Sequence, residues 1–332
     1  MQKGIIKFKN APTIISTYSV VGKKEHEGPL GDFFDEYDTD NKFNMKSWEK
    51  AEGEMQKRAF LGALKRAKLN DSDIDALFSG DLLNQCVGSS YGLLEFDIPY
   101  VGLYGACSTC AEGIALASCL VSSGSFDTCA SVTSSHFCSS ERQFRFPLEY
   151  GGQRTPTSQW TVTGAGAFII GSGGKIEIPE IMLGKTIEMG ISDINNMGAA
   201  MAPSVVDTVI RYFGESELSP SDFDLIVTGD LGFEGSEILK ELLYKKGYDI
   251  RKNHIDCGLI IFDRSKQDVH AGGSGCGCSA SVLSSTILKN LENGAIKDIL
   301  FIGTGALMSP MTLFQGEAIP GIAHLIRLRA KE

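Results

Sequence analysis

The sequence lacks any apolar run of the roughly 20 residues that a membrane-spanning helix requires. Its opening residues, MQKGIIKFKN, also lack the apolar stretch of a secretory signal peptide, so we expect no leader. Cations are scarce, because 31 Lys and Arg residues stand against 41 Asp and Glu residues and give a net charge of −10. A chain this acidic is a poor candidate for nucleic-acid binding, which needs many cations facing phosphate.

Paired metal-ligand spacings are missing as well. The two cysteines in residues 276–278 are one residue short of a CxxC motif and have no second pair, so we expect no zinc site. The glycine-rich run 272–275 has no following Lys, which argues against a phosphate loop. The acidic stretch 32–40 offers carboxylates to calcium, but its spacing is not that of an EF-hand, and we expect an exposed loop. We therefore predict no cofactor.

Nine cysteines, an odd number, lie among Ser, Gly and Ala residues. This pattern is typical of small buried thiols in a reducing compartment. Glycine is abundant, with 38 residues and no short period, which indicates many tight turns and close backbone approaches. A length of 332 residues favours about two domains.

An internal repeat divides the chain. Residues 72–82 (SDIDALFSGDL) match residues 221–231 (SDFDLIVTGDL) at six of eleven positions, with an offset of 149. Each copy is an acidic lead followed by an apolar strand that ends at Gly-Asp-Leu. Two small-residue helical runs, which open at Cys107 and Cys276, form a second ordered pair. Two ordered pairs indicate a duplicated α/β unit.

The repeat predicts two halves, residues 1–175 and 176–332. The second half opens with an expected strand at 176–181. Strands that alternate with helices predict mostly parallel sheets whose faces are covered by helices. No Pro-rich or charged linker separates the halves, so we expect them to share a large interface.

Cys107 is the sharpest candidate for chemistry. It follows residues 104–106 (YGA) at the end of an expected strand and opens a helix of small residues. The positive end of a helix dipole would lower the pKa of its thiol, although a buried structural thiol is an equally good interpretation. Cys110 completes a CxxC motif, but the order of elements is not that of a thioredoxin.

The cysteine turn, the duplicated unit and Gly124, which follows Cys107 by 17 residues, resemble the thiolase and ketoacyl-synthase superfamily. Residues 303–306 (GTGA) resemble its late glycine turn, which helps to form the oxyanion hole. The resemblance implies a thiolase-like α/β fold, with duplicated βαβαβαββ halves in layered αβαβα architecture. It places Cys107 at the position of the nucleophile, and it is compatible with a homodimer.

Two longer segments resemble one family within that superfamily. Residues 136–171 (HFCSSERQFRFPLEYGGQRTPTSQWTVTGAGAFIIG) and 270–281 (HAGGSGCGCSAS) are similar to the stage V sporulation protein AD family. That resemblance implies binding of dipicolinic acid, free or as its calcium chelate, and uptake of this ligand into the developing spore. It also implies membrane-embedded SpoVA-type partners, a peripheral location at the inner spore membrane and a link to germination.

The usual catalytic partners of the cysteine are not recognisable. In the superfamily, one His or Asn lies on the second-half turn, at the position of Cys276, and another falls at Gly229 or Asp230. A thiol is a weak donor, and loss of an oxyanion donor typically costs a factor of about 10² to 10³ in rate. His270 would restore an imidazole if the register shifted by one gap; a turn histidine is an equally good interpretation. We therefore expect a non-catalytic site, with acyl transfer through an acyl-Cys107 intermediate as the alternative.

A planar dicarboxylate needs cations or N–H donors and flat apolar walls. The region after the expected strand 128–133 is locally cationic, and Arg suits bidentate carboxylate binding. The candidate ligand-binding residues are Cys107, His136, Arg142, Arg145, Gln153, Arg154, His270 and Cys276. The candidate walls are Phe144, Phe146, Tyr150 and Trp160.

Overall fold

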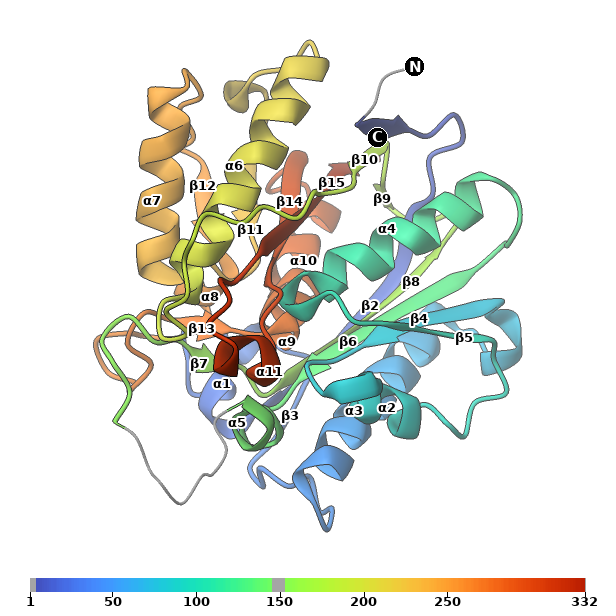
Figure 1. The fold of residues 1–332 in the computed structure, drawn as a ribbon. Coiled ribbons are helices and arrows are strands. Elements are labelled where there is room, and N and C mark those ends of the chain that lie inside the picture. The colour runs from blue at the N-terminus through green and yellow to red at the C-terminus, as the bar shows by residue number, and fades with distance from the viewer. Residues whose placement is uncertain (1–3, 145–152, 332) are drawn as a thin grey trace.

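The computed structural model describes residues 4–144 and 153–331, which form alternating strands and helices (Figure 1). The first half contains β1 (Ile5–Lys7), β2 (Thr13–Gly22), α1 (Lys23–His26), β3 (Glu36–Asp38), α2 (Trp48–Ala67), β4 (Ala76–Gly80), α3 (Val87–Gly92), β5 (Tyr100–Leu103), α4 (Thr109–Ser122), β6 (Cys129–Ser135), α5 (Phe137–Phe144), β7 (Trp160–Thr161) and β8 (Gly164–Gly171). The second half contains β9 (Ile176–Glu177), β10 (Glu180–Met182), α6 (Met197–Glu215), β11 (Leu225–Thr228), α7 (Gly232–Lys245), β12 (His254–Asp256), α8 (Cys257–Ile260), β13 (Gly273–Ser274), α9 (Cys276–Val282), α10 (Leu288–Glu292), β14 (Asp298–Ala306), α11 (Pro310–Phe314) and β15 (Gly321–Ala330).

The two halves share one strand order and one set of strand directions. In the first half, β5, β4 and β6 are parallel, and β8 runs antiparallel to both β6 and β2. In the second half, β12, β11 and β14 are parallel, and β15 runs antiparallel to both β14 and β9. This equivalence confirms the predicted βαβαβαββ duplication. Strand β9 also pairs with β2, so the two sheets are joined edge to edge.

The elements stack in five layers. Helix α2 packs on β2 and β8 of the first half, whereas α6 packs on β15 and β14 of the second. Helices α4 and α9 form the middle layer, where α4 contacts β6 and β14 and α9 contacts β8 and β6. Figure 1 shows α6 and α7 on one side of the molecule and α2 and α3 on the other. The layered αβαβα architecture is therefore confirmed.

Small side chains allow the middle layer to lie close to both sheets. Helix α4 buries Cys110, Ala111 and Ala115 completely. A Cβ added at Gly303 of β14 would lie 2.5 Å from the Cβ of Ala111, so only glycine permits this approach of strand and helix. The abundance of small residues in the sequence is thus a packing requirement of the central helices.

Three local expectations need correction. The expected strand at 176–181 is split into β9 and β10, because Pro179 has no N–H to donate to a sheet ladder. Residues 303–306, expected as a glycine turn, lie within β14, where they pair with β15. The acidic stretch 32–40 is not simply an exposed loop, because it contains β3 and because Asp35 forms ion pairs with Arg66 and Lys289.

The boundary between residues 175 and 176 stays a prediction. It coincides with the start of β9, and the two halves remain in extensive contact through the middle layer. All nine cysteines are free thiols. Among residues 4–144 and 153–331, every helix is too short or too polar to cross a lipid bilayer.

Candidate functional site

Cys107 lies on a tight turn between β5 and α4. The turn is the 3₁₀ segment η4 (Ala106–Ser108), and Ala106 has a φ of 52°, a left-handed conformation that is unusual for alanine. Three hydrogen bonds hold it: the Ser108 hydroxyl donates to the Gly105 carbonyl, the Gly105 N–H donates to the Thr109 hydroxyl, and that hydroxyl donates to the Ala106 carbonyl. The sequence expectation of a cysteine turn before a helix is confirmed.

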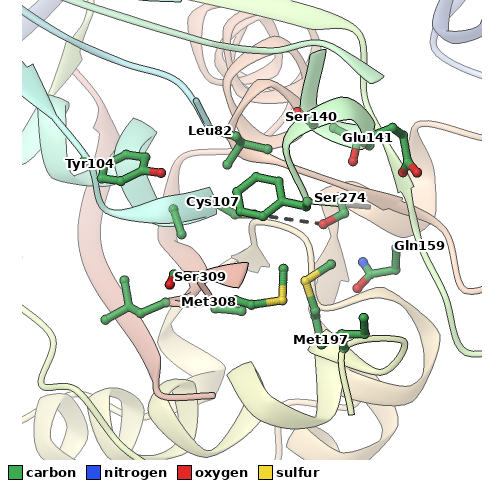
Figure 2. A pocket seen from close by; sticks show the side chains of 16 residues that line it. Leu82, Tyr104, Cys107, Ser140, Glu141, Gln159, Met197, Ser274, Met308 and Ser309 are labelled. Atoms are coloured by element: carbon green, nitrogen blue, oxygen red, sulfur yellow. Dashed lines mark hydrogen bonds between the residues drawn. The ribbon is translucent and has the colours of Figure 1, made fainter. Parts of the chain in front are cut away.

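Cys107 faces a cavity of about 280 Å³ between the two halves. The walls are mainly apolar, and several polar groups converge on the interior. The lining residues are Leu82, Tyr104, Ala106, Cys107, Ser140, Glu141, Phe144, Gln159, Thr161, Ile194, Met197, Ser274, Ala306, Leu307, Met308 and Ser309. In Figure 2, Met197 and Met308 lie on the side of the cavity opposite Ser140. We call this space the inner cavity.

A buried carboxylate supports the floor of the inner cavity. The hydroxyl of Ser274 donates to Asp230 Oδ2 over 3.0 Å, and the Gly275 N–H donates to the same atom over 2.8 Å. The Thr304 hydroxyl donates to Asp230 Oδ1 over 2.6 Å. Gln159 donates its amide N–H to the Asp230 carbonyl oxygen, which ties the cavity wall to the same residue. Burial raises the pKa of Asp230, and these donors oppose that effect.

Asp230 determines the direction of the hydrogen bond between Ser274 and Cys107. The Cys107 sulfur lies 4.0 Å from the Ser274 hydroxyl oxygen, as the dashed line in Figure 2 shows. Because the hydroxyl proton of Ser274 goes to Asp230, its oxygen presents lone pairs to the cysteine. The thiol is therefore the donor of this contact, which requires it to be protonated.

The expected fall in the pKa of Cys107 is wrong. Burial raises the pKa of this thiol well above its usual value, and the negative charge of Asp230 raises it further. Cys107 is 6% exposed, so water does little to stabilise a thiolate. Burial and Asp230 together outweigh the effect of the dipole of α4 on this thiol.

The structure brings Cys276 close to Cys107 but not into the cavity lining. Cys276 opens α9, is fully buried, and donates its thiol to the Ser134 carbonyl oxygen over 2.9 Å. The two cysteines share one apolar cluster with Leu82 and Phe144. Burial raises the pKa of Cys276 well above its usual value, so both thiols are neutral.

The structure places the other described candidates outside the inner cavity. Arg142 forms an exposed ion pair with Glu49, and Gln153 is exposed. Both Arg154 and His270 pair with Asp268. Arg142 and Arg154 thus each pair with an acidic side chain outside the inner cavity.

His136 is buried, and its ring donates to the Asn41 carbonyl oxygen over 2.7 Å. It lines a second, separate cavity together with Trp160. Of the candidate walls, Phe144 therefore lines the inner cavity and Trp160 does not. Arg145, Phe146 and Tyr150 lie outside the described residues.

Sequence reasoning missed Ser140, Gln159 and Ser274, and it dismissed Asp230 because that residue is neither His nor Asn. The hydroxyl of Ser140 is buried without a hydrogen-bond partner within residues 4–144 and 153–331, and this residue lines the inner cavity. One signal could have identified Asp230: it is the central residue of the repeated Gly-Asp-Leu motif, which follows a parallel strand at its carboxyl end, where sites form.

The fold defines a class of protein. The structure is similar to 3-oxoacyl-[acyl-carrier-protein] synthase III of Aquifex aeolicus, with a TM-score of 0.55, 13% identity, and coverage of 95% of this chain and 99% of that one. It is also similar to the acyltransferase ChlB3, with a TM-score of 0.61, 14% identity, and coverage of 97% and 98%. A variant of OleA from Xanthomonas campestris gives a TM-score of 0.60, 12% identity, and coverage of 98% and 100%. The chain thus has the thiolase-like fold of these ketosynthase-type proteins.

The sequence comparisons identify the family. The family model described as stage V sporulation protein AD matches residues 2–329. The stage V sporulation protein AD of Bacillus subtilis strain 168 is 44% identical over 318 residues, which cover 96% of this chain and 94% of that protein. This chain belongs to the stage V sporulation protein AD family.

Proposed function

We propose that this member of a sporulation protein family is a non-catalytic binding protein for dipicolinic acid, a planar pyridine dicarboxylic acid, free or as its calcium chelate. The observation that carries the proposal is the inner cavity itself. It keeps a ligand-sized volume beside Cys107, whereas the positions expected for the superfamily's His and Asn hold Cys276 and either Gly229 or Asp230. A neutral thiol with no imidazole partner suits a wall of a binding site better than a nucleophile.

The size and walls of the inner cavity suit a small flat ligand. Its volume of about 280 Å³ lies near the lower end of the roughly 300–1,000 Å³ of small-molecule sites. Leu82, Tyr104 and Phe144 provide apolar surface for a ring. The hydroxyl of Ser140, which has no hydrogen-bond partner among the described residues, supplies a donor for a carboxylate oxygen, and this bond would also satisfy a buried polar group.

The charge of a dicarboxylate needs a partner beyond these groups. Among the described lining residues of the inner cavity there is neither Lys nor Arg. Arg145, which follows Phe144 in the sequence, stays the predicted carboxylate partner. The calcium chelate would bring its own compensating charge, so either form of the ligand is compatible with apolar walls.

We extend the proposal to the setting in which the ligand moves. The protein would deliver dipicolinic acid to membrane-embedded SpoVA-type proteins at the inner membrane of the developing spore, and would act there as a peripheral protein, as a monomer or a homodimer. Membership in the stage V sporulation protein AD family supports a role in sporulation. Co-purification of the chain with those membrane proteins from sporulating cells tests this part.

Calorimetric titration with dipicolinic acid, with and without calcium, tests the binding proposal. We expect saturable binding that weakens about tenfold in Ser140→Ala, because a hydrogen bond to a charged group contributes about 1.5–3 kcal/mol. Arg145→Ala and Phe144→Ala should also weaken it. Arg142→Ala is the matched control, since Arg142 is exposed and paired with Glu49 outside the cavity. A folded wild-type protein that binds neither form of the ligand would contradict the proposal.

Acyl transfer through Cys107 is the second candidate. The shared fold and the position of Cys107 on the cavity wall at the start of α4 favour it. Incubation with acyl-coenzyme A, followed by peptide mass spectrometry, tests it directly. An acyl adduct on Cys107 that turns over would establish the enzyme; an unmodified thiol, with dipicolinic acid bound in the same preparation, would establish the binding protein.

A further inference from the structure

A second cavity of about 410 Å³ lies on the other side of α5 and β7 from the inner cavity. We call it the outer cavity. Helix α5 divides the two spaces, because Phe137 and Cys138 line the outer cavity whereas Ser140 lines the inner one. Strand β7 divides them in the same way through the adjacent residues Trp160 and Thr161. The two cavities thus share a wall but differ in chemistry.

The outer cavity is more cationic than the inner one. Its lining includes three lysines, Lys23 and Lys24 of α1 and Lys266, against two acids, Glu25 and Glu27. The described lining of the inner cavity has neither Lys nor Arg. Lys23 and Lys266 are exposed and form solvated ion pairs with Glu27 and Asp263, which compete weakly with a bound anion.

Two cations converge on one indole ring at the wall. The Lys24 ammonium lies 3.5 Å and the Arg154 guanidinium 4.7 Å from the centre of the Trp160 ring. The two cations share Asp268 as a partner: Arg154 forms an ion pair with its carboxylate, and Lys24 donates a hydrogen bond to its main-chain oxygen. The Asp268 side chain is 76% exposed and also contacts His270, so it neutralises this group poorly.

Two further observations indicate missing negative charge. The Nη1 atom of Arg154 is buried and has no hydrogen-bond partner in the described part of the chain. Of the two acids that line the outer cavity, Glu27 is exposed, and Glu25 supplies little negative charge below pH 7, because burial raises its pKa to about 7. Its carboxyl accepts the Thr163 N–H and makes no ion pair with a described residue.

We propose that the outer cavity binds a small oxyanion, a carboxylate or a phosphate, between the ammonium groups of Lys23, Lys24 and Lys266. Recognition is by charge and hydrogen bonding, because one face of Trp160 stacks on Phe137 at 3.7 Å and Lys24 covers the ring as well. This site is separate from the inner cavity, and the inference does not depend on the proposed function.

Trp160 is a built-in reporter of the outer cavity. The chain has two tryptophans, and Trp48→Phe leaves Trp160 as the single fluorophore. Titration of this variant with inorganic phosphate, and separately with succinate, should change the emission saturably, because Lys24 moves relative to the ring when an anion binds. A response to phosphate alone assigns a phosphate-bearing ligand, and a response to succinate alone assigns a carboxylate-bearing one.

Charge-neutral variants locate the binding groups. In the Trp48→Phe background, Lys23→Gln with Lys266→Gln should weaken the anion about tenfold or more, since charge-assisted hydrogen bonds contribute about 1.5–3 kcal/mol. Both side chains are exposed, so this variant should fold. Lys50→Gln is the matched control, because Lys50 is an exposed lysine on α2, away from the outer cavity.

Two results would overturn the proposal: no saturable emission change with either anion, or equal affinity in the double variant and the Lys50→Gln control. Binding of dipicolinic acid, followed by calorimetry, separates the two sites. If it survives the double variant while the anion response is lost, the cavities act independently. If dipicolinic acid instead competes with phosphate for the Trp160 response, the outer cavity holds an oxyanion, as inferred, and the assignment of dipicolinic acid to the inner cavity fails.

Discussion

Replacement of Asp230 by Asn should activate the thiol of Cys107. The carboxylate lies within about two hydrogen-bond lengths of the sulfur, since both contact the Ser274 hydroxyl, and it raises the pKa of Cys107 by its charge and by a hydrogen bond from the thiol. At the outer limit of roughly 7 Å and an effective dielectric constant of about 20, two unit charges interact by about 2 kcal/mol, and a closer approach increases the effect. Removal of this repulsion lowers the pKa of Cys107 and should raise its thiolate population, and hence its alkylation rate at fixed pH, by roughly 30-fold.

The assay is the rate of iodoacetamide labelling of Cys107 at pH 8, read by peptide mass spectrometry so that the other eight cysteines do not interfere. Asp256→Asn is the matched control. Asp256 is an equally buried acid, and it binds the N–H groups of Leu231 and Gly232 rather than Ser274. The control should leave the labelling of Cys107 near the wild-type rate.

An unchanged or slower rate in Asp230→Asn, with the fold intact by circular dichroism, would refute the reasoning. It would mean that burial alone keeps Cys107 protonated and that the Asp230–Ser274 contact has no electrostatic role. An equal acceleration in both variants would show loosened packing instead. Only an increase in the labelling rate that is confined to Asp230→Asn supports the assignment of Asp230 as the group that keeps the Cys107 thiol protonated.

Three further predictions concern the framework. Burial raises the pKa of Glu52 to about 8, so the wild-type protein loses stability as pH rises from about 4.5 to 8 and the unfolded chain ionises. Glu52→Gln does not titrate, so its free energy of unfolding relative to wild type should rise by roughly 2–4 kcal/mol between urea titrations at pH 5 and pH 8. An equal pH dependence of the two proteins would contradict this. Gly305→Val should lower the unfolding temperature by several degrees, because a Cβ there lies 2.8 Å from the Gly105 oxygen. Tyr212→Phe removes a buried 2.6 Å hydrogen bond to Glu180 and should cost about 1–2 kcal/mol in urea denaturation; no loss would mean that Glu180 is satisfied without it.

The sequence was sufficient for the fold because the fold repeats. The matched segments 72–82 and 221–231 correspond to the equivalent strands β4 and β11, and the small-residue runs correspond to α4 and α9. Helix starts were less predictable. The start of α6 at Met197, for example, depends on Asn196, whose side-chain oxygen accepts a hydrogen bond from the Ala199 N–H.

The site was less predictable than the fold, because its electrostatics depend on contacts between distant segments. The pKa of Cys107 is raised by burial and by Asp230, 123 positions away, and that carboxylate accepts hydrogen bonds from Ser274 and Thr304 of two further strands. Local charge density was also misleading, since the exposed ion pair of Arg142 with Glu49 is set by α2, not by any neighbour in sequence.

The duplication also explains why the two thiols are both neutral. Each cysteine lies at the start of the central helix of its own half. Burial raises the pKa of both thiols, and the aspartate of the Gly-Asp-Leu motif of the other half raises it further, Asp230 for Cys107 and Asp81 for Cys276. The two thiols have equivalent surroundings but differ in exposure to the inner cavity. Cys276 is fully buried, whereas Cys107 lines that cavity. A ligand in that cavity therefore meets one thiol, and neither half alone would supply both the thiol and the acid that keeps it protonated.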